Sequence, residues 1–126
     1  MAKRKVTNIS EVALITCVVQ KGLADTINSS LLEVGVQGST VHMGVGTGVR
    51  ERLGILGVAV DVEREIISVL VAKDQLARIF ERMFLAGRLD TPGMGYIYAT
   101  PLVQAATYIP AHLMEDRPTS AMGAMA

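Results

Sequence analysis

The sequence predicts one α+β domain in which a strand, a helix and a strand are followed by a second strand, helix and strand. Short apolar runs rich in β-branched residues alternate with two segments whose apolar residues recur at helical spacing. Glycine and proline gather between these segments. The chain has 126 residues, 50% of them hydrophobic, so it is long enough to bury one core.

The charges and the cysteine count exclude several classes of partner. The 12 Lys and Arg balance the 12 Asp and Glu, and no block of like charges would attract nucleic acid. The single cysteine, Cys17, allows neither a disulfide framework nor a multi-cysteine metal site within one chain. The apolar run after the basic start is too short for a signal peptide or a membrane span. We therefore expect a cytoplasmic protein that binds no nucleic acid and does not insert in a membrane.

The first half of the chain predicts a strand, a helix and a strand. Residues 1–11 are polar and are expected to form a flexible arm. Residues 12–19 are rich in β-branched side chains and too few for a typical helix, which predicts a central strand. Apolar residues then recur at helical spacing up to Val34, and Gly35 is expected to end this helix. Residues 36–43 predict the second strand.

The second half repeats this order. Residues 65–71 predict a strand, and Asp74 is a candidate cap for the helix that follows. That helix has the clearest amphipathic stripe of the chain and is expected to pack on the sheet. Its stripe consists of Leu76, Ile79, Phe80, Met83 and Phe84. Proline and glycine dominate the turn at 89–95, and residues 96–102 predict a last strand that Pro101 places at an edge.

Residues 49–62, between the two halves, have neither a helical nor a strand period. Long loops in compact domains commonly have a function, and this one has too many apolar residues for an idle solvated loop. Two interpretations stay open: the segment binds a partner, or it extends the sheet as a hairpin. At the other end of the chain, residues 111–126 are small and weakly polar, and we expect a disordered tail.

These elements give a β-α-β-β-α-β order, which is the ferredoxin-like architecture of one antiparallel sheet with both helices on one face. The domain would span residues 12–110. Because the strands are near-continuous hydrophobic runs, the sheet face without helices is also apolar and is expected to be buried against another surface. Closed cyclic symmetry would bury that face, so the sequence predicts an oligomer.

A glycine-dense stretch follows the second predicted strand. Alternating glycines, from Gly44 to Gly48, let backbone N–H groups approach a bound anion. Thr40 and Thr47 would add hydroxyl groups. The alternative is a strand followed by a loop without a ligand, and a short glycine motif does not decide between the two.

Three motifs resemble the PII family of signal-transduction proteins. They are Glu-Val-Gly-Val-Gln-Gly-Ser-Thr-Val at 33–41, Gly-Thr-Gly at 46–48 and Pro-Gly-Met-Gly-Tyr-Ile-Tyr at 92–98. With the order of elements, the resemblance spans residues 12–109. It implies a ferredoxin-like homotrimer that binds adenine nucleotides in clefts between subunits. It also implies regulation of a target protein, such as an ammonium transporter or an enzyme of nitrogen metabolism.

Matched position by position, the resemblance implies a ligand site for ATP, ADP or AMP and no cofactor or metal. The implied ligand-binding residues are Gly38, Ser39, Thr40, Gly46, Thr47, Gly48, Gly93 and Gly95. Residues 49–62 become the loop that binds the target, with Arg50, Glu51 and Arg52 as its contact residues.

The chain departs from the family's pattern where the family binds phosphate. Met94 and Tyr96 stand in place of an acidic residue and a lysine, and Thr107 and Ile109 in place of paired arginines. Each charge-assisted contact to a phosphate is worth roughly 1.5–3 kcal/mol. We therefore expect a triphosphate to bind more weakly unless the two arginines of the loop substitute, and the chain resembles a divergent PII-like branch.

Other classes of function have less support from the residues. His42 and His112 lack the spacing of a hydrolytic triad or a zinc site, so we expect no enzyme. One alternative is a trimeric interaction module that has lost its ligand. Another is a metal-binding trimer of the divalent-cation-tolerance type, with His42 joined by Cys17 or His112 across subunits.

Overall fold

The computed structural model describes residues 4, 6–36, 38–46 and 62–108. In chain order, its elements are β1 (Asn8–Ile9), β2 (Val12–Gln20), α1 (Leu23–Glu33), β3 (Ser39–Gly46), β4 (Val62–Ala72), the 3-10 turn η2 (Lys73–Gln75), α3 (Leu76–Ala86), β5 (Gly95–Pro101) and β6 (Ala105–Ala106).

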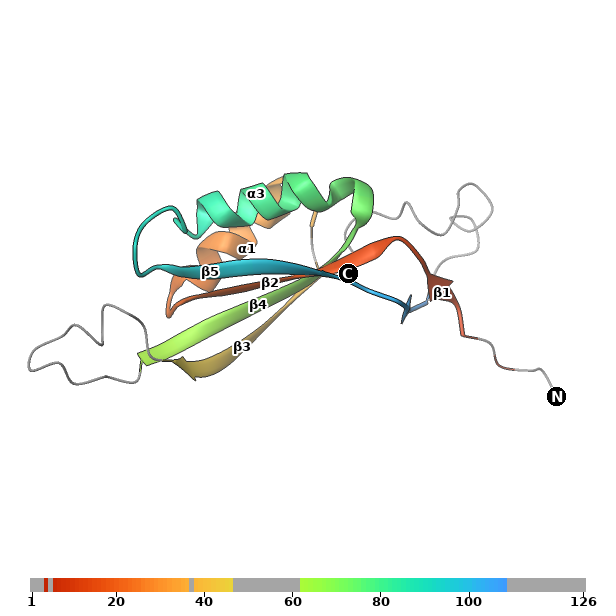
Figure 1. Cartoon of the computed structure of the whole chain (residues 1–126), viewed down its shortest axis with the longest axis horizontal. Helices are drawn as coiled ribbons and strands as arrows, with labels where there is room; N and C mark the ends of the chain where they lie inside the picture. Colours follow the sequence, from red (N-terminus) through yellow and green to blue (C-terminus); the bar gives the residue numbers. More distant parts are fainter. Residues whose placement is uncertain (1–3, 5, 37, 47–61, 109–126) are drawn as a thin grey trace, which may run out of the picture.

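The main sheet has four strands in the order β3-β4-β2-β5, and every neighbouring pair is antiparallel. Both helices lie on the same face of this sheet (Figure 1). We call that face the helix face and the opposite one the open face. The predicted ferredoxin-like α+β fold is therefore confirmed.

The pairing of β2 with β4 decides which side chains enter the core. Its register runs from Val12 opposite Ala72 to Gln20 opposite Arg64. Because side chains alternate along a strand, every second residue of β2 faces the helices. These residues, three apolar residues of β4 and the inner faces of both helices form one core with little or no solvent exposure. The core includes Ile15, Cys17, Val19, Ile27, Leu31, Ile67, Val69, Val71, Ile79 and Met83.

Helix α1 ends as the sequence predicts. Gly35 adopts a φ of 85° and its N–H donates to the carbonyl of Leu32 at 3.1 Å. The N–H of Val36 donates to the carbonyl of Leu31 at 2.9 Å, and the Val36 side chain is buried. This pair of hydrogen bonds is the Schellman arrangement, which favours glycine at the left-handed position.

The expected cap of the second helix is wrong. Asp74 lies inside the 3-10 turn η2, and α3 begins only at Leu76. Gln75 therefore occupies the N-cap position, and its side chain forms no capping hydrogen bond. The amphipathic stripe itself is confirmed, since Ile79 and Met83 are buried against the sheet.

Part of the expected flexible arm is a strand. β1 pairs with β6, with Asn8 opposite Ala106 and Ile9 opposite Ala105. Ile9 and Val12 are buried together in a small second cluster, against which Leu102 packs. Burial of these apolar side chains holds β1 against β6, although the polar composition of residues 1–11 predicts no regular structure there.

The glycine-dense stretch is also more regular than the sequence suggests. β3 continues to Gly46, and β4 begins at Val62, earlier than expected. Gly44 pairs with Arg64 and Gly46 pairs with Val62. Up to Gly46 the stretch is therefore a strand of the sheet and not a turn, because β4 supplies partners for its backbone.

Gly95 has a structural reason to be glycine. Its φ is +138°, and a Cβ atom there would lie 2.0 Å from the carbonyl oxygen of Val18 on β2. Only a residue without a side chain lets β5 approach β2 this closely. The motif that resembles a ligand-binding turn is thus also required for pairing of the two strands.

We expect Gly95→Ala to lower the free energy of unfolding by at least about 3 kcal/mol, because it adds backbone overlap to an unfavourable φ. Gly35→Ala is the matched control, since its φ of 85° is also unfavourable but open space surrounds it. Its cost should be about 1 kcal/mol. Urea unfolding followed by circular dichroism measures both. Equal losses of unfolding free energy in the two variants would show that the close approach of Gly95 to the Val18 carbonyl contributes nothing to the cost of Gly95→Ala.

Candidate functional site

Four strands bring the glycine motifs to one end of the sheet. Met43, Glu65, Val19 and Gly95 stand opposite one another across β3, β4, β2 and β5. β3 ends and β4 begins beyond this row, at the left of Figure 1. We call this the glycine end, defined by Gly46, Gly93 and Gly95. The chain leaves the described sheet at Gly46 and returns at Val62, so both ends of the predicted target-binding loop attach here.

The two glycine segments lie on opposite edges of the sheet. Gly46 ends β3, which is one edge strand, and Gly95 begins β5, which is the other. Three inter-strand spacings separate these edges by about 14 Å. Backbone from both segments can therefore surround one small ligand only where the two edges belong to neighbouring copies of the chain.

The third predicted segment does not lie at the glycine end. Thr40 precedes Gly46 by six residues, which is about 20 Å along a strand. The hydroxyl of Ser39 donates to Asn28 Oδ1 on α1 at 2.8 Å, so Ser39 faces the helices and Thr40 faces the other way. Gly38 directly precedes this part of the strand. Five predicted residues lie outside the described part of the chain: Thr47, Gly48, Arg50, Glu51 and Arg52.

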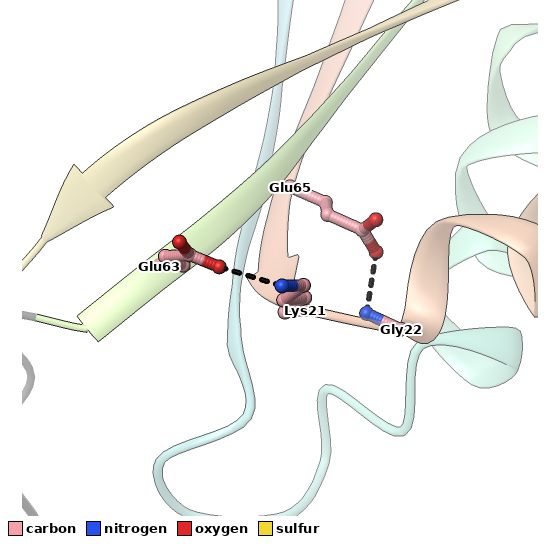
Figure 2. Close-up of polar contacts among 4 residues, drawn as sticks. All are labelled: Lys21, Gly22, Glu63 and Glu65. Carbon is pink, nitrogen blue, oxygen red and sulfur yellow. Dashed lines mark hydrogen bonds and ion pairs between the residues drawn. The ribbon is translucent and has the colours of Figure 1, made fainter.

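A carboxylate of the chain itself occupies the N-terminus of α1. Glu65 Oε1 accepts hydrogen bonds from the N–H of Gly22 at 2.7 Å and of Ala24 at 2.9 Å; Figure 2 shows the first of these. Gly22 is the N-cap residue and has no side chain to cap the helix. β4 supplies the acceptor in its place, which satisfies two otherwise unpaired N–H groups. This helix end is thus already filled and offers no anion site.

The lysine of the same turn is also engaged. Lys21 Nζ lies 2.9 Å from Glu63 Oε2, and both side chains are largely exposed (Figure 2). The hydrogen bond to the Glu63 carboxylate raises the pKa of Lys21.

A side-chain hydrogen bond holds the second glycine turn against the sheet. At the end of β2, Gln20 Nε2 donates to the carbonyl oxygen of Gly93 at 3.1 Å.

We expect Glu65→Ala to lower the free energy of unfolding by about 1.5–3 kcal/mol, because it removes a charged acceptor from two helix N–H groups. Glu63→Ala is the matched control on the same strand. It removes only an exposed ion pair, which is worth about 0–1 kcal/mol. Chemical denaturation of both variants at pH 7 provides the measurement. A larger loss for Glu63→Ala than for Glu65→Ala would contradict this account of the glycine end.

The open face is apolar and rich in hydroxyl groups. One row across all four strands consists of Thr40, Ser68, Thr16 and Tyr98. The rows on either side carry half-buried aliphatic residues of β2 and β4: Val18 and Ile66 on one side, Leu14 and Leu70 on the other. In the part of the open face that the structure describes, Arg64 is the one formally charged residue, and it is only 9% exposed. Sequence reasoning missed Thr16 and Ser68, because only the register reveals that they align with Thr40.

Tyr96 and Tyr98 lie on the open face of β5, directly after Gly95. Their rings are stacked, with centroids 6.3 Å apart and an interplanar angle of 18°. They are nevertheless 60% and 48% exposed. Tyr96 stands opposite Val18 at the glycine end. An exposed aromatic surface thus occupies the position where the resemblance implies a phosphate-binding lysine.

The structure argues against Cys17 as the partner of His42 in the metal-binding alternative. Cys17 faces the helices and is fully buried, and this burial raises the pKa of its thiol to about 11. His42 pairs with Ile66 in a row that faces the opposite side of the sheet. Cys17 therefore reaches neither His42 nor a neighbouring copy, and His112 lies outside the described residues. Residues 4, 6–36, 38–46 and 62–108 contain no group of three or more side chains that could hold a metal ion.

Neither α1 nor α3 is long and apolar enough to cross a bilayer.

Comparison with known proteins identifies the fold. No protein-family model matches the sequence, and a search of curated proteins finds no similar one. Among solved structures, the chain is similar to the crystal structure of Arabidopsis thaliana PII bound to citrate. The two share 22% sequence identity over 74% of this chain and 78% of that chain, with a TM-score of 0.59.

Proposed function

Given its PII-like fold, we propose that this chain is a regulatory protein that senses an adenine nucleotide between the subunits of a homotrimer. The observation that carries the proposal is the placement of the glycine segments. They lie at one end of the sheet but on its two opposite edges, so neighbouring copies are needed to bring them around one ligand. Of the residues that the resemblance implies, the ligand-binding ones would be Gly46, Thr47, Gly48, Gly93 and Gly95.

The open face supports the homotrimer. Its aliphatic rows are half-buried in one chain, and its described part carries one charged residue. Both edge strands, β3 and β5, also lack charged side chains, which commonly protect an edge from pairing. A closed cyclic assembly would cover the open face of every copy without leaving one exposed.

Signalling would pass through residues 49–62, with Arg50, Glu51 and Arg52 in contact with the target. Because this segment attaches to the sheet at the glycine end, a ligand bound there would change the affinity for the target. The target would change the affinity for the ligand by the same factor. A membrane transporter or a metabolic enzyme is the proposed target, and the role is regulatory and not catalytic.

Calorimetric titration tests the proposal with ATP, ADP and AMP. Citrate belongs in the same series, because the similar Arabidopsis protein has citrate bound. We expect heat and a thermal shift with at least one adenine nucleotide, at one site per subunit. No heat and no shift with any of the three nucleotides would overturn the nucleotide-sensor proposal.

The double variant Gly46→Val with Gly48→Val locates the site. Valine suits a β-strand at Gly46 but blocks close approach of a ligand to the backbone. We expect at least about a tenfold loss of affinity, which corresponds to about 1.4 kcal/mol, with the trimer intact. Val45→Thr is the control, since Val45 is 72% exposed on the opposite face of the same strand. Unchanged affinity in the double variant would place the site elsewhere.

A second function, a trimeric interaction module without a ligand, is favoured by one observation. Lys21 is paired with Glu63, and Glu65 fills the start of α1, so these groups at the glycine end are satisfied within the chain. If this second function is correct, the calorimetric titrations with ATP, ADP and AMP would give no heat and no thermal shift, while the protein would still be a trimer in solution.

A further inference from the structure

We infer that Gln20 is a positioning residue of the proposed ligand site and that Lys21 links it to the segment proposed to bind the target. Gln20 fixes the orientation of the glycine turn before β5, and Lys21 fixes the end of β2 that carries Gln20. Neither side chain needs to touch a ligand for this role. The inference rests on the proposed function and adds two residues that lie outside the motifs of the resemblance.

The turn at residues 91–94 leads directly into β5. Gly93 has a φ of 82°, and the N–H of Met94 donates to the carbonyl of Thr91 at 3.3 Å. With a proline at its second position, this is the pattern of a type II turn. The carbonyl oxygen of Gly93 accepts a hydrogen bond from Gln20 Nε2 at 3.1 Å. The C=O and the N–H of the 93–94 peptide group are thus both hydrogen-bonded.

The orientation of this peptide group matters for binding. Backbone N–H groups form an anion site only when they point toward the ligand together. Glycine lets peptide planes rotate at little steric cost, and the turn has glycine at both 93 and 95. The hydrogen bond from Gln20 selects one orientation before a ligand arrives. Less conformational freedom is then lost on binding, which raises the affinity.

Two contacts hold the end of β2 on β4. The register of these strands ends at Gln20, and strand ends open more readily than strand centres. Directly beyond this residue, Lys21 Nζ lies 2.9 Å from Glu63 Oε2 (Figure 2). The N–H of Gly22 donates to Glu65 Oε1 at 2.7 Å. Both contacts keep the backbone that carries Gln20 in place, and with it the donor to the glycine turn.

The link also reaches the segment proposed to bind the target. That segment rejoins the sheet at Val62, where β4 begins, and Glu63 is the next residue. A displacement of this strand end acts on Lys21 through the ion pair, and on the glycine turn through Gln20. The two glycine segments of one chain lie on opposite edges, with β4 and β2 between them. The link crosses these two strands and so connects the segments within one chain.

Hydrogen exchange followed by NMR on the full-length chain tests the link without a ligand. Gln20→Met removes the donor but keeps a side chain of similar length. The amide of Met94 should then exchange roughly 2- to 12-fold faster, the equivalent of one hydrogen bond. Glu63→Ala should speed exchange at Met94 by roughly 1.5- to 5-fold, the equivalent of an exposed ion pair.

Two matched controls remove contacts of the same kinds elsewhere. Gln104→Met removes the hydrogen bond from Gln104 Nε2 to Asn8 Oδ1, which is 2.7 Å long. Glu33→Ala removes the exposed ion pair of Glu33 with Arg82 at 3.8 Å. Neither variant should change exchange at Met94.

Calorimetric titration with ATP, ADP and AMP then tests the positioning role. For each nucleotide that the wild type binds, Gln20→Met should lower the affinity roughly 2- to 12-fold, with the molar mass in solution unchanged. Gln104→Met should leave the affinity unchanged. If Gln20→Met does not fold, Glu63→Ala still decides the inference, because it changes only an exposed residue and should also weaken nucleotide binding.

Two results would overturn the inference while the proposed function stands. The first is a wild-type exchange rate at Met94 in Glu63→Ala, which would show that no link joins this residue to the turn. The second is wild-type nucleotide affinity in Gln20→Met, even with faster exchange, since the contact would then be merely structural. Absence of binding of all three nucleotides by the wild type would instead overturn the proposed function and the positioning role together.

Discussion

The antiparallel pairing of β2 with β4 is the constraint on which the rest of the structure depends. It joins the first strand-helix-strand unit to the second along nine paired residues, from Val12 opposite Ala72 to Gln20 opposite Arg64. This register sends Cys17 and Ile67 together toward the helices and Thr16 and Ser68 together toward the open face. A slip by one residue would exchange the two faces and expose the core.

The same register places Glu65 where α1 needs an acceptor. The helix starts at a glycine that has no side chain to cap it, and the carboxylate reaches its N–H groups from the neighbouring strand. Strand pairing and helix capping are therefore coupled at the glycine end. The same coupling engages the Glu65 carboxylate within the chain, at the end of the sheet where β4 begins.

The sequence predicted the fold because the fold follows from local patterns. β-branched runs identified four strands, helical spacing identified two helices, and Gly35 marked the end of the first. What the sequence could not show depends on contacts between distant segments. The strand at Asn8–Ile9 exists only because Ala105–Ala106 pairs with it.

The sequence identifies several residues of the candidate site but not how they are arranged on the sheet. Gly46, Gly93 and Gly95 do lie at one end of the sheet, but Thr40 lies far along β3 and Ser39 faces the helices. These outcomes depend on strand order and register, which no local pattern encodes. Gly95 also shows that one glycine can satisfy a packing requirement in the very motif that suggests a ligand.

The central claim is that neighbouring copies complete the glycine end, and the molar mass in solution tests it most directly. Multi-angle light scattering coupled to size-exclusion chromatography should give three times the 13.4 kDa of one chain at micromolar concentration. A single mass of 13.4 kDa under the same conditions would contradict the account, because one chain holds Gly46 and Gly95 on opposite edges of its sheet.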